Sequence, residues 1–190
     1  MLNPLLIASR AAAGCALALA LLSPVHAAPV LQMSTTATAG GIDLTVSAQD
    51  VVDLYAYQFT LNFNPALLTA LGTTEGAFLP SGGSTFFLPG DIDNDAGSVS
   101  FVLGTLFGAG GGVTGSGDLA TFSFAVDQPG LASFSFADVF FLDSTSAEIA
   151  VTATNLATQV PEPGSLWLAG IALFAVLGGR AMRFPNRRSS

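Results

Sequence analysis

Apolar and polar residues alternate through most of the chain between residues 28 and 160. In the clearest stretch, residues 55–63, every second position carries Tyr, Phe or Leu, and the positions between carry Ala, Gln, Thr and Asn. A period of two is typical of β-strands with one buried face. The same period recurs at residues 42–48, 99–103, 120–126, 134–136 and 149–153. Only a turn at residues 65–71 has a helix-like pattern, so the sequence predicts an all-β fold.

Clusters of Gly, Pro, Asn and Asp separate these segments and predict turns. Two connections, at residues 76–95 and 108–117, are rich in small and turn-forming residues, and the run Phe86-Phe87-Leu88 within the first predicts a short edge strand. About 130 residues suit one domain, which at this size buries roughly two-thirds of the surface of its unfolded chain. We therefore expect a single β-sandwich of two packed sheets.

The first 27 residues are typical of a secretory signal peptide. Arg10 precedes the apolar run at residues 11–22, and small residues flank His26 in the sequence Val25-His26-Ala27. These are the charged, hydrophobic and cleavage regions that a signal peptidase reads. We expect cleavage after Ala27, which makes Ala28 the first residue of the mature protein.

The C-terminal segment, residues 160–190, has three parts in a fixed order. The motif Val160-Pro161-Glu162-Pro163 comes first, and an uncharged apolar run at residues 165–179 follows it. As a helix this run is about 22 Å long, which is shorter than the roughly 30 Å hydrocarbon core of a membrane. The last part is a basic tail. The residues expected to set depth and topology are Trp167 near the outer interface and the arginines Arg180, Arg183, Arg187 and Arg188.

This order of parts resembles the PEP-CTERM sorting signal. The positive-inside rule places the arginine tail in the cytoplasm and the rest of the chain outside the membrane. The resemblance implies an exported bacterial protein that is held transiently in the inner membrane and processed by an exosortase. Its destination would be the cell surface or the extracellular matrix. A permanent tail anchor is the alternative.

Charge is distributed unevenly along the chain. All five arginines and the single His, Cys and Trp lie in the two end segments, and the chain has no lysine. The predicted domain, residues 28–159, has twelve carboxylates and no basic side chain, so its formal charge is −12. Such a domain repels phosphate backbones, which excludes nucleic acid as a partner. It also has no cysteine for disulfides or thiolate metal sites.

The composition of the domain leaves few routes to catalysis. Without His, Cys or Lys it cannot form the nucleophilic and Schiff-base sites that use those residues. Only carboxylate pairs of the kind that glycosidases use remain. We therefore predict that the protein is not an enzyme.

Two glycine- or aspartate-rich motifs carry candidate chemistry. Residues 110–115 satisfy the dinucleotide-binding pattern G-x-G-x-x-G by count, but a strand is predicted after them where the motif needs a helix. Asp91, Asp93 and Asp95 alternate as the ligands of a calcium loop do, although Ala96 stands where an EF-hand needs glycine. We favour a hairpin turn built on Asn94, Asp95 and Gly97, with calcium binding as the alternative and no other cofactor.

The aromatic residues Tyr55 and Tyr57 are a further candidate site. They lie on one face of the predicted strand with Phe59, and such a row can form a platform on which a sugar ring stacks. Aromatic residues that alternate along a strand are more often part of the core. We favour the core position.

Three segments of the predicted domain resemble cohesin domains. They are Tyr57 to Leu68, where an apolar strand runs into an Asn-Pro turn, Asp95 to Phe101, which matches a hairpin, and Gly115 to Phe124, which matches a glycine turn and core strand. Asn64 departs from the usual aspartate. The resemblance implies a jelly-roll β-sandwich, related to carbohydrate-binding modules, with a binding role in polysaccharide-degrading assemblies. It identifies no contact residues.

Two functions remain open from the sequence. One is an exported binding module of the cell surface or matrix that binds extracellular polysaccharide or a dockerin-like protein. The alternative is a structural acidic protein of the exopolysaccharide matrix without one specific ligand.

Overall fold

The computed structural model describes residues 28–160, and the predicted signal peptide and sorting segment lie outside these residues. One short 3₁₀ helix, η1 (Leu79–Gly82), interrupts a chain that otherwise consists of strands and their connections. The strands are β1 (Val30–Thr38), β2 (Gly41–Phe63), β3 (Leu68–Glu75), β4 (Thr85–Leu88), β5 (Asp91–Asp93), β6 (Ser98–Leu106), β7 (Val113–Val126), β8 (Gly130–Asp143), β9 (Thr152–Ala153) and β10 (Leu156–Val160). Within residues 28–160 no helix has the length and apolar character needed to cross a membrane.

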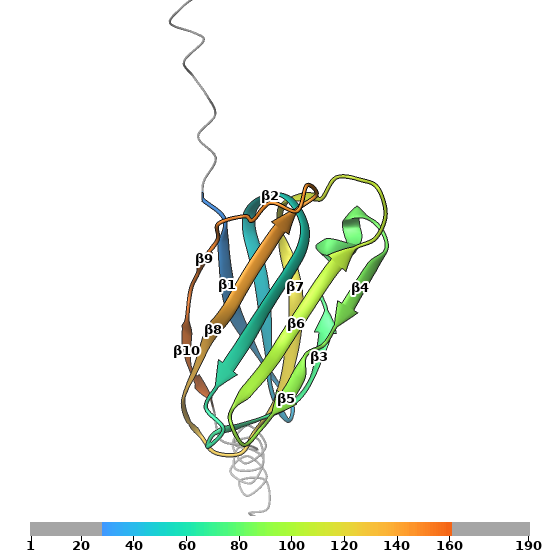
Figure 1. Ribbon diagram of the computed structural model, residues 1–190. Coiled ribbons are helices and arrows are strands. Elements are labelled where there is room, and N and C mark those ends of the chain that lie inside the picture. Colours follow the sequence, from blue (N-terminus) through green and yellow to red (C-terminus); the bar gives the residue numbers. More distant parts are fainter. Residues whose placement is uncertain (1–27, 161–190) are drawn as a thin grey trace, which may run out of the picture.

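Strand β2 belongs to two sheets. Its first half pairs with β1 and β7, and its second half pairs with β6 and β8. The first sheet therefore has the order β9-β1-β2-β7-β3, and the second has the order β10-β8-β2-β6, with β4 and β5 both paired to the far edge of β6. Figure 1 shows the second sheet in front of the first. The predicted β-sandwich is confirmed.

Two aspartates set the point at which β2 passes from one sheet to the other. Asp50 and Asp53 have left-handed backbones, with φ of 53° and 59°. Aspartate tolerates this conformation better than most residues because its short polar side chain can hydrogen-bond locally. The register with β7 shifts between Ala48 and Val51 and again before Leu54, so the strand bends through two bulges.

Asp53 also joins the bend to two loops that are distant in sequence. One carboxylate oxygen accepts a hydrogen bond from the backbone N–H of Gly112. The other accepts the hydroxyl of Ser144 at 2.6 Å and its backbone N–H at 3.3 Å. These bonds, the Ser144 hydroxyl first, lower the pKa of Asp53 because they stabilise its ionised form.

Inward-facing aromatic residues from both sheets form the centre of the core. The largest fully buried side chains include Tyr57, Phe59, Phe122, Phe124, Phe134 and Phe141. Their rings meet mostly in tilted pairs, such as Phe124 and Phe134 at 5.4 Å between centroids. Interdigitation of side chains from two sheets is how a sandwich buries both inner faces.

Tyr57 is part of this core, which is the position that the alternation of apolar and polar residues favoured. It is 1% exposed, stacks beside Phe59 and donates its hydroxyl to the carbonyl of Leu119 at 2.8 Å. Burial, with a smaller contribution from the charge of Glu75, raises its pKa. A Cβ on Gly104 would lie 2.5 Å from the ring, so glycine there makes room for it. Tyr57 is thus unavailable to stack on a sugar.

Several predicted boundaries need correction. Residues 149–153 do not form one closing strand, because only β9 lies there and the chain closes with β10. Neither β1 nor β10 was predicted, since Ser and Thr weaken the contrast between their two faces. Strand β7 begins at Val113, so the second glycine-rich connection ends earlier than predicted. The turn at residues 65–71 likewise ends where β3 begins, at Leu68.

We expect Asp53→Asn to destabilise the domain and to reduce the loss of stability in acid. A carboxyl whose pKa is lower in the folded state stabilises that state above its unfolded pKa. It loses this contribution as the pH falls through the folded pKa. The asparagine has no such titration. Urea unfolding between pH 2 and 7 measures the effect. The control is Asp50→Asn, which makes the same change at the same bend in a side chain without such bonds. Equal pH profiles for the two variants would contradict the role of Asp53.

Candidate functional site

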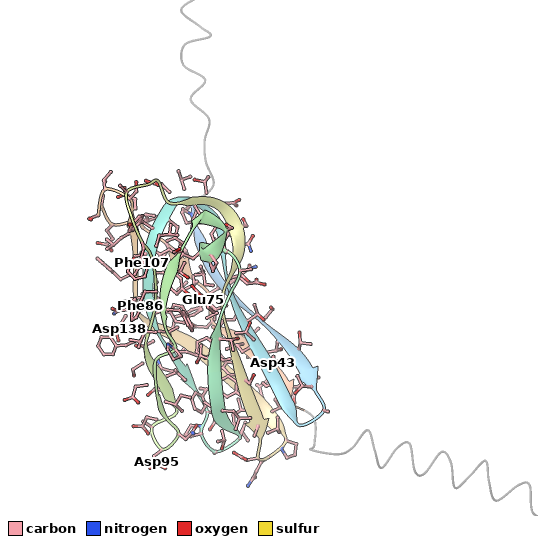
Figure 2. All side chains as sticks on the ribbon, turned by 90° about the vertical axis from the view of Figure 1, so that its right-hand side faces the viewer. Asp43, Glu75, Phe86, Asp95, Phe107 and Asp138 are labelled. Atoms are coloured by element: carbon pink, nitrogen blue, oxygen red, sulfur yellow. The ribbon has the colours of Figure 1, made fainter. Side chains whose placement is uncertain are left out.

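Exposed apolar side chains gather on the outer face of the sheet formed by β10, β8, β2 and β6. Eight large apolar residues among residues 28–160 are exposed, and six of them lie on or beside this face: Leu131 at the start of β8 and a group of five away from that end. We call these five the apolar face: Phe86, Leu88, Phe101, Phe107 and Phe140. Figure 2 shows Phe86 and Phe107 on the same side of the sandwich, and their rings meet edge to face at 6.4 Å.

Strand register explains why these side chains are neighbours. One row runs across four strands from Phe140 on β8 through Gln58 on β2 and Leu103 on β6 to Leu88 on β4. A second row runs from Leu142 through Ala56 and Thr105 to Phe86. Neighbouring strands lie about 4.8 Å apart, so the side chains within a row are adjacent. The two rows form a nearly continuous apolar surface.

Phe101 is held on this face by a bulge in β6. The register with β2 shifts between Phe59 and Leu61, and Phe101 adopts φ of 57° with 62% of its surface exposed. A left-handed backbone is unfavourable for a bulky residue, and so is an exposed aromatic ring. Strained residues of this kind cluster at functional sites, where bulges re-aim side chains.

The bulge also corrects a prediction. The sequence pattern grouped Val99, Phe101 and Leu103 on one face of a strand, but the structure buries Val99 and Val102 and turns Phe101 and Leu103 outward. No signal in the sequence marks the bulge. The apolar surface on β4, by contrast, did have a signal in the sequence. The run Phe86-Phe87-Leu88 is apolar on both faces, which is typical of a strand that is covered on both sides.

Carboxylates border the apolar face. Asp138 on β8 is exposed and accepts a hydrogen bond from the Thr60 hydroxyl at 3.4 Å. On the far edge, Asp91 and Asp93 of β5 lie in register with Ser100 and Ser98. Residues 28–160 contain no basic side chain to balance them. The face is therefore complementary to a partner with an apolar centre and basic surroundings.

The aspartates predicted to bind calcium or to form a turn do form the turn. The Asp93 carboxylate accepts the backbone N–H groups of Asp95 at 3.0 Å and Ala96 at 2.8 Å. The Asn94 side chain bonds both the N–H and the carbonyl of Ala70, which ties the turn to the edge of β3. In the described part of the chain, no three His, Cys, Asp or Glu side chains are grouped so as to hold a metal ion.

The remaining candidates have structural positions. Tyr55 donates its hydroxyl to the carbonyl of Gly108 at 2.7 Å and so fixes the loop before β7. The glycine pattern at residues 110–115 runs from that loop into β7, so a strand follows it, as predicted. Hydrogen bonds, that from the Thr145 hydroxyl first, lower the pKa of Asp143 within its own turn. Turn formation accounts for this shift without a catalytic role.

Comparison with known families gives two matches. A model of the cohesin domain matches residues 30–160, and a model of the PEP-CTERM protein-sorting motif matches residues 159–183. Both were expected from the resemblances in the sequence. No curated protein matches the chain.

Solved structures share the fold at low sequence identity. A non-cellulosomal cohesin from Archaeoglobus fulgidus is 12% identical, with a TM-score of 0.55 over 70% of this chain and 91% of that one. The cohesin of a type I cohesin–dockerin complex from Clostridium thermocellum is 16% identical, with a TM-score of 0.56 over 70% and 99%. A type II cohesin module of Acetivibrio cellulolyticus is 15% identical, with a TM-score of 0.56 over 68% and 88%.

We expect Phe101→Gly to stabilise the domain, because glycine adopts a positive φ without the steric cost that another residue bears. The gain should be about 1 kcal/mol in the free energy of unfolding, measured by urea denaturation. Val102→Gly, at the neighbouring buried position, is the matched control and should destabilise. A Phe101→Gly variant that is less stable than the wild type would show that the ring contributes to the fold and would weaken its assignment to a binding surface.

Proposed function

The chain belongs to the cohesin-domain family, and we propose that it is an exported, non-enzymatic module that binds a partner protein through its apolar face. The family relation supports a binding role without catalysis. The observation that carries the choice of surface is the pair of apolar rows from β8 to β4, with Phe101 strained outward beside the row that contains Leu103. Aromatic residues are enriched at protein interfaces and often supply most of the binding energy.

The partner is a dockerin-like protein. Several of the structurally similar cohesins were solved in complex with a dockerin, among them one from Clostridium thermocellum and one from Acetivibrio cellulolyticus. For the present chain, the acidic border favours a partner surface in which Lys or Arg flanks an apolar centre. Such a pairing would speed association and weaken as salt rises.

Export and sorting complete the proposal. The sorting-motif match includes Val160, Pro161, Glu162 and Pro163, which supports exosortase-mediated sorting to the cell surface. We propose that signal peptidase removes residues 1–27. Residues 165–179 then hold the intermediate in the inner membrane, with Trp167 and the arginine tail setting its topology, until an exosortase acts. The final location is the cell surface or the extracellular matrix.

A structural acidic matrix protein is the second candidate. It is favoured by the formal charge of −12 on residues 28–160, which would hydrate and swell a polymer network. Such a role needs no particular face, so it does not explain why the apolar side chains are concentrated on one sheet. Extracellular polysaccharide is a further partner class, and it suits the opposite sheet, whose outer surface carries hydroxyl groups.

Replacing Phe86 and Phe140 by serine should weaken partner binding by about 30-fold or more and leave folding intact. Loss of two aromatic anchors typically costs 2 kcal/mol or more, which is roughly a 30-fold weaker Kd. Titration calorimetry of residues 28–160 against the dockerin modules of the source organism measures this. Leu71→Ser is the control, because Leu71 is even more exposed than either phenylalanine but lies on β3 of the other sheet.

Two outcomes would refute the protein-binding proposal. One is that no dockerin module binds the wild-type domain. The other is that the double serine variant and the Leu71→Ser control bind with equal affinity. Binding that survives both changes would assign the interface to another surface.

We expect the mature protein at the cell surface to lack the arginine tail. Mass spectrometry of the surface fraction should find no peptide containing Arg187 or Arg188 in cells with an exosortase. A variant with Pro161→Ala and Pro163→Ala should retain these peptides, because the rigid motif that the enzyme reads is gone. Wild-type protein that still carries both arginines at the surface would favour the permanent tail anchor.

A further inference from the structure

The outer face of the first sheet is a lattice of hydroxyl groups. One row crosses four strands in register, from Ser34 on β1 through Thr45 on β2 and Thr121 on β7 to Thr74 on β3. The next row carries Thr36, Asp43, Ser123 and Gly72 in the same strand order. We call the six hydroxyl-bearing residues of these rows the hydroxyl face: Ser34, Thr36, Thr45, Thr74, Thr121 and Ser123.

Backbone geometry makes this lattice regular. Hydroxyls within a row are about 4.8 Å apart, and successive rows are about 6.7 Å apart, because residues two apart on a strand share a face. All six side chains are exposed or half-buried. Asp43, at the edge of this lattice, lies on the side of the sandwich opposite Phe86 and Asp138 in Figure 2. The hydroxyl face and the apolar face are therefore on opposite sides of the domain.

Most of these hydroxyls are available for a ligand. Within residues 28–160, Thr74 donates its hydroxyl to the carbonyl of Thr121 at 3.4 Å and Ser123 donates its own to Asp43, whereas the side chains of Ser34, Thr36, Thr45 and Thr121 form no such bond. The one carboxylate in the two rows, Asp43, already accepts the Ser123 hydroxyl at 2.9 Å. A hydroxyl can both donate and accept, so the row can match a sugar hydroxyl of either polarity.

We propose that the hydroxyl face binds a neutral polysaccharide of the extracellular matrix along the row from Ser34 to Thr74. Charge and side-chain size argue against the other classes of partner. A polyanion or an anionic membrane is repelled by a domain of charge −12 that has no basic side chain. A protein partner needs several apolar anchors, but both rows lack a side chain larger than threonine or aspartate, and Leu71 beside Gly72 is a single exposed apolar neighbour. A neutral, repeating chain of hydroxyl groups is what the surface complements.

Affinity on such a surface comes from repetition. Each hydroxyl exchanges one hydrogen bond to water for one to sugar, so a single contact contributes little. A polymer presents many copies of its repeat to the same row and raises the effective concentration of each. A long polysaccharide should therefore bind where a disaccharide does not. With a protein on the apolar face, the domain would attach that protein to the matrix.

Native affinity electrophoresis tests this with the domain of residues 28–160. The gels contain hydroxyethyl cellulose, dextran or galactomannan as neutral polymers, or carboxymethyl cellulose as the anionic counterpart of the first. We expect retardation in at least one neutral gel and none in the anionic gel. A variant with Ser34→Ala, Thr45→Val and Thr121→Val removes three hydroxyls and keeps β-branched side chains on β2 and β7, and it should bind at least tenfold more weakly.

Two controls separate this proposal from the protein-binding one. Thr105→Val, on the outer face of the other sheet, removes a hydroxyl outside the lattice and should bind as the wild type does. A single Thr45→Glu variant, which places a charge in the middle of the row, should lose retardation even if the triple variant folds poorly. Circular dichroism melting verifies the fold of each variant.

The outcomes that overturn the proposal are equally specific. Absence of retardation in all three neutral gels would show that the hydroxyl face is an ordinary solvated sheet surface. Unchanged retardation of a folded triple variant would remove these residues from the site. Retardation that is lost only in the variant with Phe86→Ser and Phe140→Ser would place the sugar on the apolar face. None of these results bears on dockerin binding, which has its own probe.

Discussion

The bend in β2 is the constraint on which the rest of the structure depends. A single 23-residue strand supplies a central strand to both sheets, so the relative position of the sheets follows from the conformation of residues between Asp50 and Asp53. The Asp53 carboxylate bonds the loop before β7 and the loop after β8 to this point. Because β2 pairs on both sides in each sheet, an error at the bend would shift the register of β1, β6, β7 and β8 together.

The absence of basic side chains from residues 28–160 determines how the loops are held. Within this range a carboxylate has no Lys, Arg or His to pair with, so the carboxylates that form hydrogen bonds here accept them from neutral donors. Asp53, Asp93 and Asp143 all bond backbone N–H groups, and Asp118 accepts the Ser47 hydroxyl at 2.7 Å. Such bonds are charge-assisted and stronger than those between neutral groups. The domain therefore gains local order from its acidic residues although their net repulsion opposes compactness.

The sequence predicted the fold class and much of the core because both depend on the alternation of side chains. Residues 55–63 have the predicted faces, with Tyr57, Phe59, Leu61 and Phe63 buried. The continuity of β2 was not predictable, since the aspartates at residues 50 and 53 are of a type that favours turns over strand interiors. The apolar face was hidden for a related reason. One extra residue at the β6 bulge reverses the faces of Phe101 and Leu103, and no local signal in the sequence marks a bulge.

The two outer faces of the sandwich differ in what they need for solubility and for binding. An apolar face on a secreted domain risks self-association, and the formal charge of −12 opposes it by electrostatic repulsion between copies. The same charge would repel an acidic partner and attract a basic one, so a single property provides solubility and selectivity for the apolar face. The hydroxyl face needs neither attraction nor apolar contact if its ligand is neutral. Placing the two on opposite sheets lets both be occupied at once, because β2 contributes to each through a different half of the strand.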